Sequence, residues 1–271
     1  MFKNKTFIIT GASRGIGKAI ALKLARDSAN IVIASKSVKE DPRLGGTIYS
    51  AAEEVEQAGG KALAVPCDIR FEDQIANVVS QAAAVFGGID GIINNASAIS
   101  LTPTGQTETK RLDLMYNINV RGTFLMTKHC LPYLKQSSNP HILNLSPPLN
   151  ITPQWLGISV PYSISKFNMS MMALGWSAEF RKEGIAANAL WPVTTIATAA
   201  VQNLLGGDEM IAHSRKPDIM ADAAHYILSR PSRELTGNLF LDEEVLKRAG
   251  ITDFSSYAVT PGVTLQKDLF V

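Results

Sequence analysis

Short apolar segments alternate with longer amphipathic segments along almost the whole chain. The short segments have the length of strands that are buried on both faces, and we predict seven of them: Thr6–Thr10, Ile31–Ala34, Ala62–Pro66, Ile89–Asn94, His141–Leu145, Ala186–Leu190 and Asn238–Leu241. The segments between them repeat apolar residues at helical spacing, which predicts helices over Lys18–Ser28, Ile48–Ala58, Gln74–Phe86, Lys110–Lys135, Ser163–Lys182 and Ala221–Ser229.

Strands that alternate with helices are joined by right-handed crossovers, so they form a parallel sheet with helices on both faces. The pattern therefore predicts a Rossmann-type, doubly wound α/β fold with a seven-stranded parallel sheet, in one domain over residues 1–271. Ligands of such sheets bind beyond the carboxyl ends of the strands. Two segments that follow such strand ends show no regular pattern, Leu101–Thr109 and Thr194–Pro217. We expect substrate loops there, at about residues 97–109 and 194–217.

Composition narrows the choice of partners. Apolar residues make up 46% of the chain, and its 26 Lys and Arg and 24 Asp and Glu residues are scattered, which argues against nucleic acid and anionic lipid. No apolar run is long enough to span a membrane or to act as a signal segment. Cys67 and Cys130 lack further ligands at zinc spacing, so we expect no metal site, no disulfide and a cytoplasmic location.

A glycine-rich turn follows the first predicted strand, in the segment Thr10-Gly-Ala-Ser-Arg-Gly-Ile-Gly17. Glycine permits a tight turn and a close backbone approach, and the free N–H groups before the next helix can hold a dinucleotide pyrophosphate. An ordinary glycine-rich turn is the alternative, but the strand-turn-helix setting favours a dinucleotide site. The predicted contacts are Gly11, Ala12, Ser13, Arg14, Gly15, Ile16 and Gly17.

The end of the second strand indicates which dinucleotide binds. An acidic residue there would accept the ribose hydroxyls of NAD, whereas this chain has Ser35 and Lys36. Lys36 and Arg14 supply cations for a 2′-phosphate, so we expect NADP rather than NAD, although both side chains are also compatible with solvated surface charges. Asp68, after the third strand, is a candidate acceptor for the adenine amino group, or else a helix N-cap.

Tyr162 and Lys166 are the candidate acid/base pair. They are four residues apart on a predicted helix and share one face, where an ammonium stabilises a phenolate. Bringing a phenol from a pKa near 10 to about 7 takes roughly 4 kcal/mol, which Lys166 and a positively charged nicotinamide ring can supply together. An ordinary exposed pair is the alternative. With the glycine turn upstream, the pair indicates hydride transfer to or from a carbonyl.

These motifs resemble the short-chain dehydrogenase/reductase family over essentially the whole chain. Thr10–Gly17, Asn94–Ala96, Asn119 and Tyr162–Lys166 follow the family's order and approximate spacing. The chain is most similar to the hydroxysteroid dehydrogenase-like subgroup, on the segments Gly46–Tyr49, Ser97–Ser100, Lys110–Met115, Ser146–Asn150 and Thr236 to Ala258. Eukaryotic members of that subgroup continue into a sterol-carrier-like domain. We expect none here, and no peroxisomal address at the ending Asp268–Val271.

The resemblance implies a role for each motif. Tyr162 is then the proton donor and acceptor, Lys166 binds the nicotinamide ribose and lowers the tyrosine pKa, and Asn119 anchors a water of the proton relay. Asn95 and Pro192 border the cofactor. The family also implies a homodimer or homotetramer through the helices Lys110–Lys135 and Ser163–Lys182, so that the Met-rich segment Asn168–Trp176 is core or subunit interface rather than a cofactor site.

The chain departs from the family pattern at three positions near the nicotinamide. The family's catalytic serine is replaced by Pro147, which has no hydroxyl, and Ser146 is the nearest residue that could take its place if the two prolines redirect the turn. Ser97 and Val193 replace family glycines. If no hydroxyl reaches the carbonyl oxygen, the loss of one such donor lowers the rate by roughly 10²–10³.

Two functions of different kinds follow from these features. The first is an NADP-dependent alcohol dehydrogenase or carbonyl reductase, with Tyr162, Lys166, Asn119 and Ser146 as its catalytic residues. The second is a catalytically weak or inactive sensor that binds NADP(H). Apolar residues in the loops suggest a lipid, isoprenoid or steroid-like substrate, although core packing of the same residues would give the same pattern: Trp155, Leu156, Ile158, Val160, Leu204, Leu205 and Met210.

Overall fold

A single parallel sheet organises the computed structural model, which describes residues 1–271. Its strands lie side by side in the order β3-β2-β1-β4-β5-β6-β7, and every pair is parallel. The strands are β1 (Thr6–Thr10), β2 (Asn30–Ser35), β3 (Lys61–Pro66), β4 (Gly91–Asn94), β5 (His141–Leu145), β6 (Ala186–Trp191) and β7 (Leu239–Leu241). The predicted seven-stranded, doubly wound sheet is therefore confirmed.

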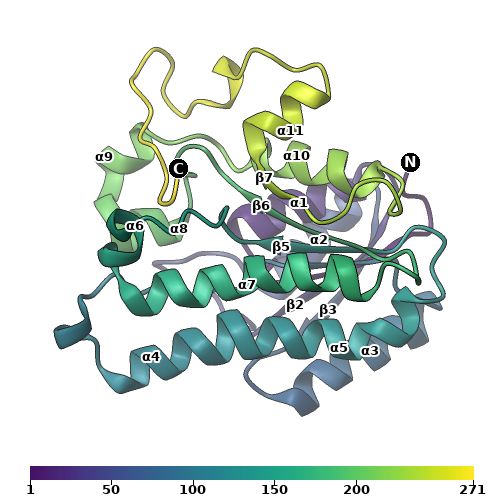
Figure 1. Ribbon diagram of the computed structural model, residues 1–271. Helices are drawn as coiled ribbons and strands as arrows, with labels where there is room; N and C mark the ends of the chain where they lie inside the picture. The colour runs from purple at the N-terminus through teal and green to yellow at the C-terminus, as the bar shows by residue number, and fades with distance from the viewer.

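Two layers of helices bury the two faces of the sheet (Figure 1). One layer consists of α1 (Gly15–Ala25), α2 (Ile48–Gln57), α10 (Asp218–Ser229) and α11 (Asp242–Arg248). The other consists of α3 (Glu72–Phe86), α4 (Thr109–Met115), α5 (Thr123–Leu134) and α7 (Val160–Glu179). Successive strand residues point to opposite faces of the sheet, so each face has its own hydrophobic core. Ile9 and Ile33 pack against the first layer of helices, and Ile8 and Val32 pack against the second.

The helix expected over Lys110–Lys135 has a wider turn in its middle. The structure divides it into α4, a π-helical turn over Tyr116–Gly122 (η2), and α5. Asn119 lies in this turn with its side chain fully buried, and it bonds to the backbone of Ala98 and to the hydroxyl of Ser165. Such π-turns insert one residue into a helix and often occur at functional sites, so the interruption positions Asn119 while the helix axis continues.

The expectation that Thr194–Pro217 is irregular was wrong. This segment forms α8 (Ala199–Val201), a π-turn over Gln202–Gly206 (η3), and α9 (Gly207–Ala212). Thr198 caps the first of these, because its hydroxyl accepts the Val201 N–H at 3.4 Å. Two further helices were not predicted, α6 (Pro153–Ile158) and α11. All these elements except α11 are at most six residues long, which leaves too few positions for a helical period to be recognised.

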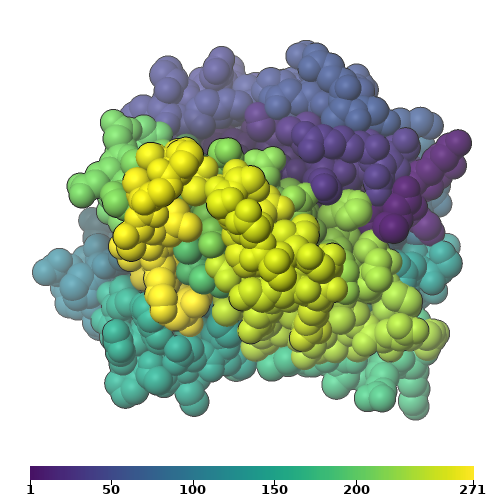
Figure 2. Space-filling model, turned by 90° about the horizontal axis from the view of Figure 1, so that it is seen from above, coloured from purple at the N-terminus to yellow at the C-terminus, as the bar shows by residue number.

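The first predicted substrate segment, Leu101–Thr109, is irregular apart from a 3₁₀ turn over Thr104–Gln106 (η1). Past α11 the chain contains only one more 3₁₀ turn, Ser255–Tyr257 (η4), and then crosses the carboxyl edge of the sheet. Figure 2 shows this last segment lying on the molecule beside the residues of α8 and α9. The helices are all too short or too polar to cross a lipid bilayer.

His141, the first residue of β5, is a buried histidine at the amino end of that strand. Its Nε2–H donates to the carbonyl of Arg230 at 3.1 Å, and Nδ1 has no partner. Burial lowers the pKa of His141 from 6.5 to about 4. The unfolded chain therefore takes up a proton at a higher pH than the folded chain, and stability that is present above pH 6.5 is lost as the pH falls toward 4.

We expect His141→Gln to weaken the acid sensitivity of the fold. A pKa difference of this size corresponds to about 3 kcal/mol between pH 7 and pH 4, so the variant should lose less unfolding free energy over that range than the wild type, as measured by urea denaturation. His213→Gln, at a histidine that is half-buried, is the control. Equal pH dependence of wild type and His141→Gln would contradict this account.

Candidate active site

A cavity of about 630 Å³ lies beyond the carboxyl ends of the central strands, which is within the usual size range of small-molecule sites. It extends from the glycine turn, past the ends of β2 and β4, to Tyr162 and Lys166 on α7. Residues of the two predicted loops contribute to its wall, among them Ser97, Ile99, Thr198, Leu204 and Leu205. The sheet therefore brings both halves of the predicted site into one cavity.

The glycine turn has the backbone geometry of a phosphate cradle. Gly11 and Gly15 adopt left-handed φ angles of +69° and +57°, which side chains disfavour. Asn95 secures the turn from the end of β4, because its Nδ2 donates to the carbonyl of Thr10 at 2.8 Å and to that of Gly11 at 3.2 Å. A Cβ on Gly17 would lie only 2.5 Å from that Nδ2, so Gly17 permits the close packing of α1 against Asn95.

Most of the predicted cofactor contacts line the cavity. They are Gly11, Ser13, Arg14, Gly15, Ile16, Lys36, Asp68, Asn95, Lys166 and Pro192. Ala12 and Gly17 do not, since both are buried beneath the turn. Their contribution is therefore to support the turn rather than to contact a ligand.

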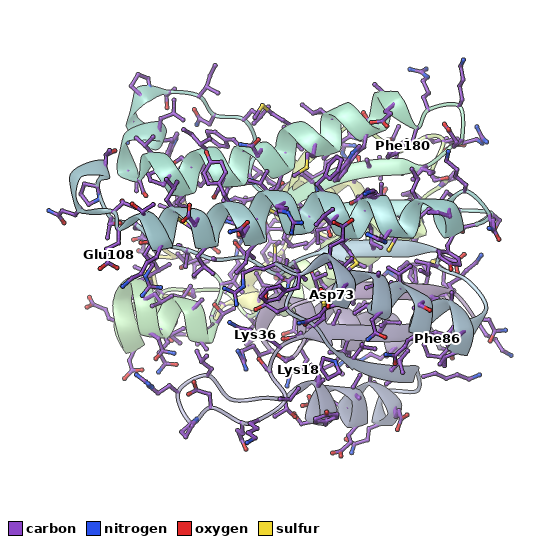
Figure 3. The ribbon with its side chains drawn as sticks, turned by 90° about the horizontal axis from the view of Figure 1, so that it is seen from below. Lys18, Lys36, Asp73, Phe86, Glu108 and Phe180 are labelled. Carbon is purple, nitrogen blue, oxygen red and sulfur yellow. The ribbon has the colours of Figure 1, made fainter.

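The cations near the end of β2 are held in different ways. Arg14 is fixed by the carbonyls of Gly45 and Gly46, at 2.7 and 3.0 Å, and by the hydroxyl of Ser37 at 3.0 Å. The Lys36 side chain is exposed and makes no hydrogen bond or ion pair within the chain. Figure 3 shows Lys36 near the middle of the view, between Glu108 on one side and Phe86 on the other. One cation is thus preorganised beside the cavity and the other is free to move.

Asp68 lines the cavity but already has a partner. Its carboxylate accepts from Arg70, with the closest contact at 2.6 Å, and its backbone N–H donates to Gln74. Hydrogen bonds from Arg70 are the main cause that lowers the pKa of Asp68. The carboxylate does not cap α3, which starts at Glu72. Arg70 occupies both carboxylate oxygens, with its backbone N–H and Nε on Oδ1 and its Nε and Nη2 on Oδ2.

Tyr162 and Lys166 both lie in α7, which begins at Val160 with Pro161 in its first turn. They are 5% and 2% exposed, and both line the cavity. The Lys166 ammonium donates to the carbonyl of Leu145, at the end of β5, at 2.6 Å, and it lies 5.1 Å from the centre of the Trp191 ring. The Tyr162 hydroxyl makes no hydrogen bond within the chain, so it is free to meet a ligand.

Burial shifts the pKa values of both groups toward their neutral forms. Desolvation lowers the pKa of Lys166 to about 7, and the nearby Asp268 carboxylate opposes this. Desolvation, with a smaller contribution from Asp268, raises the pKa of Tyr162 well above its ordinary value of 10. In the absence of a ligand the chain therefore holds Tyr162 as a protonated phenol, which is the form that donates a proton.

The two remaining catalytic candidates do not line the cavity. Asn119 accepts from the Ala98 N–H at 2.8 Å and donates to Ser165 of α7 at 3.0 Å, so it joins the first loop to the helix that carries Tyr162. The single proton of the Ser170 hydroxyl is donated to the carbonyl of Pro147 at 2.5 Å, and the buried Ser146 hydroxyl, 2.9 Å from Ser170 Oγ, donates to that oxygen. In this arrangement Ser146 is bonded to Ser170 on α7 and lies outside the cavity that Tyr162 lines.

Sequence reasoning missed the residues that close the site. Trp191 ends β6 and borders the cavity together with Asp268 and Leu269 from the last segment of the chain. Phe270 is 1% exposed, and its ring lies 6.3 Å from that of Tyr162 and 5.1 Å from that of Phe167. Trp191 could have been found, because it follows directly on a buried strand. No local pattern indicates that the last residues return to the active site.

Val193, which replaces one of the family glycines, is held by α11 and by the last segment of the chain. The Val193 N–H donates to the Asp242 carboxylate at 3.0 Å, and its carbonyl accepts the Asp268 N–H at 3.1 Å. Ser97 lines the cavity. The loop after β6 is thus held by the Asp242 side chain and by the chain's last segment.

Comparison with known proteins agrees with this geometry. A family model described as short chain dehydrogenase matches residues 5–207. Hydroxysteroid dehydrogenase-like protein 2 of Xenopus tropicalis is 57% identical over 266 residues, which are 98% of this chain and 63% of that protein. The chain thus spans less than two thirds of the length of these relatives.

Solved structures give the same result. The crystal structure of a putative dehydrogenase from Xanthomonas campestris matches with a TM-score of 0.97 at 52% identity, covering 100% of this chain and 99% of that one. A metagenomic short-chain oxidoreductase in complex with NADP shares the fold, with a TM-score of 0.73 at 22% identity over 89% of this chain and 97% of its own. The chain belongs to the short-chain dehydrogenase family, a family of oxidoreductases, which confirms the resemblance.

Proposed function

We propose that this chain is an NADP-dependent oxidoreductase that transfers a hydride between nicotinamide and an alcohol or carbonyl group of an apolar substrate. The observation that carries the proposal is one continuous cavity that joins the phosphate cradle at Gly11–Gly15 to the Tyr162 hydroxyl and the Lys166 ammonium. Residues 1–271 act in this proposal as one dinucleotide-binding domain, with the substrate loops at 97–109 and 194–217.

The residues present fit a nicotinamide dinucleotide. A Cβ on Gly11 would meet Ala96 and Asn95 at 3.0 Å, and the left-handed φ of Gly15 disfavours a side chain there. A pyrophosphate would be held there at the start of α1. Pro192 and Lys166 would hold the nicotinamide riboside at the far end of the cavity. When bound, the reduced dinucleotide supplies a hydride to a carbonyl carbon.

The charges at the end of β2 support NADP over NAD. No carboxylate occupies the position where Ser35 and Lys36 stand, and Arg14 is fixed beside Ser37 at 3.0 Å. The two cations would recognise a 2′-phosphate. The metagenomic oxidoreductase named above was solved with NADP, which is compatible with this choice.

Tyr162 would act as the general acid in carbonyl reduction and as the base in the reverse direction. Burial and the neighbouring Asp268 keep its proton on the phenol until a carbonyl oxygen accepts it. Lys166, anchored on the Leu145 carbonyl, would orient the ribose and supply positive charge as the phenolate forms. The buried rings of Phe270 and Phe167, together with the half-buried ring of Trp155, exclude water from this side of the site.

The same walls favour an apolar substrate. The cavity wall includes Ile99, Ile118, Trp191, Leu204 and Leu205. Binding an apolar substrate against this surface is favoured by about 25 cal/mol of free energy for each Å² of apolar area removed from water. Long-chain aldehydes, isoprenoid aldehydes and ketosteroids are therefore the substrate classes to test.

A sensor that binds NADP(H) without turnover is the second candidate. It is favoured by Pro147, which has no hydroxyl, and by Ser146, whose hydroxyl bonds to Ser170 on α7 at 2.9 Å. The intact pair Tyr162 and Lys166 favours the enzyme.

Tyr162→Phe tests the choice between these functions. We expect NADPH-dependent reduction of apolar aldehydes and ketones to fall by about 10²–10⁴ in kcat, because the general acid is lost, while NADPH binding by fluorescence titration is unchanged. Tyr49→Phe, at an exposed tyrosine on α2, is the control. Turnover that survives in Tyr162→Phe would refute the tyrosine chemistry. A wild type that binds NADPH and turns over none of the substrates would support the sensor.

Lys36→Asp tests the cofactor preference. Losing a charge-assisted contact of about 1.5–3 kcal/mol should raise the Kd for NADPH by roughly 10- to 100-fold, and the new carboxylate should improve the affinity for NADH. Isothermal titration with both nucleotides measures the change. Lys39→Asp, an exposed lysine three residues further on, is the control. An unchanged ratio of the two affinities in Lys36→Asp would show that Lys36 is a solvated charge.

We also propose a homodimer or homotetramer in a reducing compartment, most simply the cytoplasm. The helices α4, α5 and α7 lie side by side on one face (Figure 1) and expose the apolar residues Leu112, Phe124, Ile164 and Met171, which are 37–49% exposed. Contiguous apolar patches of this kind mark interaction surfaces. Both cysteines, Cys67 and Cys130, are buried and free.

Charging this face should separate the subunits. We expect Phe124→Glu with Met171→Glu to give a smaller species than the wild type in analytical ultracentrifugation, because both side chains would be desolvated in the interface. Val85→Glu, at a 58% exposed residue of α3, should leave the assembly unchanged. A wild type that sediments as a monomer would contradict the proposal.

A further inference from the structure

The last segment of the chain is built into the catalytic cavity by hydrogen bonds at several points. Lys267 pairs with Thr194 in an antiparallel bridge, and Thr195 N–H donates to the carbonyl of Gln266 at 2.9 Å. The Asp268 N–H donates to Val193 at 3.1 Å, and the indole N–H of Trp191 donates to the carbonyl of Leu269 at 2.9 Å. Figure 1 shows the end of the chain lying near α6 and α8. These bonds fix the position of residue 268.

Phe270 anchors the segment from the other side. Its ring is buried among those of Trp155, Tyr162, Phe167 and Trp191, with centroid distances from 5.1 to 6.3 Å. Because Asp268 lies two residues before this anchor and its own backbone is bonded to Val193, its carboxyl group is held beside Tyr162 and Lys166. All three side chains line the same cavity.

The Asp268 carboxyl group has one oxygen engaged and one available. Oδ1 accepts the N–H of Leu269 at 2.7 Å, and no hydrogen bond or ion pair within the chain reaches Oδ2. The residue is half-buried and lines the cavity, so Oδ2 is open to a ligand there and can donate a hydrogen bond when the group is protonated.

The surrounding charges agree with a protonated group. Burial raises the pKa of Asp268 to about 7, with a further upward contribution from Asp242 at the start of α11 and an opposing contribution from Lys166. Tyr162 is the other titratable group of α7 that faces it. Asp242 itself is fully buried, and Arg215, which bonds to Glu243 at 2.7 Å, is the nearest cation on that side.

The chain lacks a second hydrogen-bond donor for a carbonyl oxygen at the usual place, since Pro147 has no hydroxyl and Ser146 is bonded to Ser170. We propose that the Asp268 carboxyl group takes this role and donates a hydrogen bond to the carbonyl oxygen that Tyr162 protonates. This proposal rests on the proposed function. In the step, a hydride from NADPH adds to the carbonyl carbon, the C=O π electrons move to oxygen, and that oxygen takes the Tyr162 proton. Asp268 keeps its own proton and stabilises the developing charge.

Two substitutions at this position separate the loss of the hydrogen-bond donor from the loss of side-chain volume. Asp268→Ala removes the donor, and we expect kcat for carbonyl reduction to fall by roughly 10²–10³ with little change in the KM for NADPH. Asp268→Asn retains an N–H donor that does not titrate, and we expect it to keep activity within about tenfold of the wild type. Asp113→Asn, at an exposed aspartate of α4, is the matched control.

The pH profile gives a readout that a merely structural role would not change. Wild-type kcat should fall as the pH rises above about 7, where Asp268 loses its proton, and this limb should be absent in Asp268→Asn. Any limb due to Lys166 or Tyr162 remains in both proteins, so the difference between them isolates Asp268.

A measurement without turnover tests the protonation itself. A carboxyl group whose pKa is higher in the folded than in the unfolded chain contributes stability at low pH, and this contribution is lost as the pH rises through about 7. The melting temperature of Asp268→Asn minus that of the wild type should therefore be larger at pH 8 than at pH 5, by at least about 4 °C. A constant difference would overturn the proposal.

The outcomes also separate this proposal from the proposed function. If the wild type turns over and Tyr162→Phe abolishes turnover, but Asp268→Ala retains the wild-type kcat, the oxidoreductase stands and the role of Asp268 is wrong. A higher KM for NADPH with an unchanged kcat in Asp268→Ala would assign Asp268 to cofactor binding and overturn its role as donor. If the wild type turns over no carbonyl substrate, both proposals fail. If Asp268→Ala does not fold, the pH profile of Asp268→Asn decides.

Discussion

The buried ammonium of Lys166 is the constraint on which the site depends. An isolated charge in the interior is unfavourable, and here it is tolerated because the carbonyl of Leu145 accepts a hydrogen bond from it at 2.6 Å and the Trp191 ring lies 5.1 Å away. That carbonyl is free to do so because it stands at the carboxyl end of β5, where the ladder stops. The sheet edge thus fixes α7, and α7 fixes Tyr162 one turn earlier.

The same edge organises the other half of the cavity. Asn95, at the end of β4, bonds to the carbonyls of Thr10 and Gly11 and so couples the glycine turn to the centre of the sheet. Asn119, in the π-turn between α4 and α5, couples the first loop to α7 through Ala98 and Ser165. Two amides therefore connect the sheet to the glycine turn and to α7: Asn95, which is half-buried and lines the cavity, and Asn119, which is fully buried and does not.

Much of the fold and half of the site could be predicted from local patterns. The strands of buried apolar residues and the turn Gly11–Gly17 are local, because burial on both faces and left-handed φ angles restrict which residues can occupy those positions. The spacing of Tyr162 and Lys166 is also local, since a helix places them on one face. The short elements α6, α8 and α9 were missed because each spans too few residues to show a period.

The sequence by itself determined the alternation of strands and helices that predicts a doubly wound parallel sheet, the glycine turn, and the helical spacing of Tyr162 and Lys166, since each is a pattern of residues close together in the chain. Only the tertiary structure decided that Ser146 faces Ser170, that Arg14 is fixed by Gly45 and Gly46, and that Asp268 and Phe270 return to Tyr162. These contacts join segments up to about a hundred residues apart. They arise because packing of the whole chain, rather than any local preference, sets which side chains share a buried space.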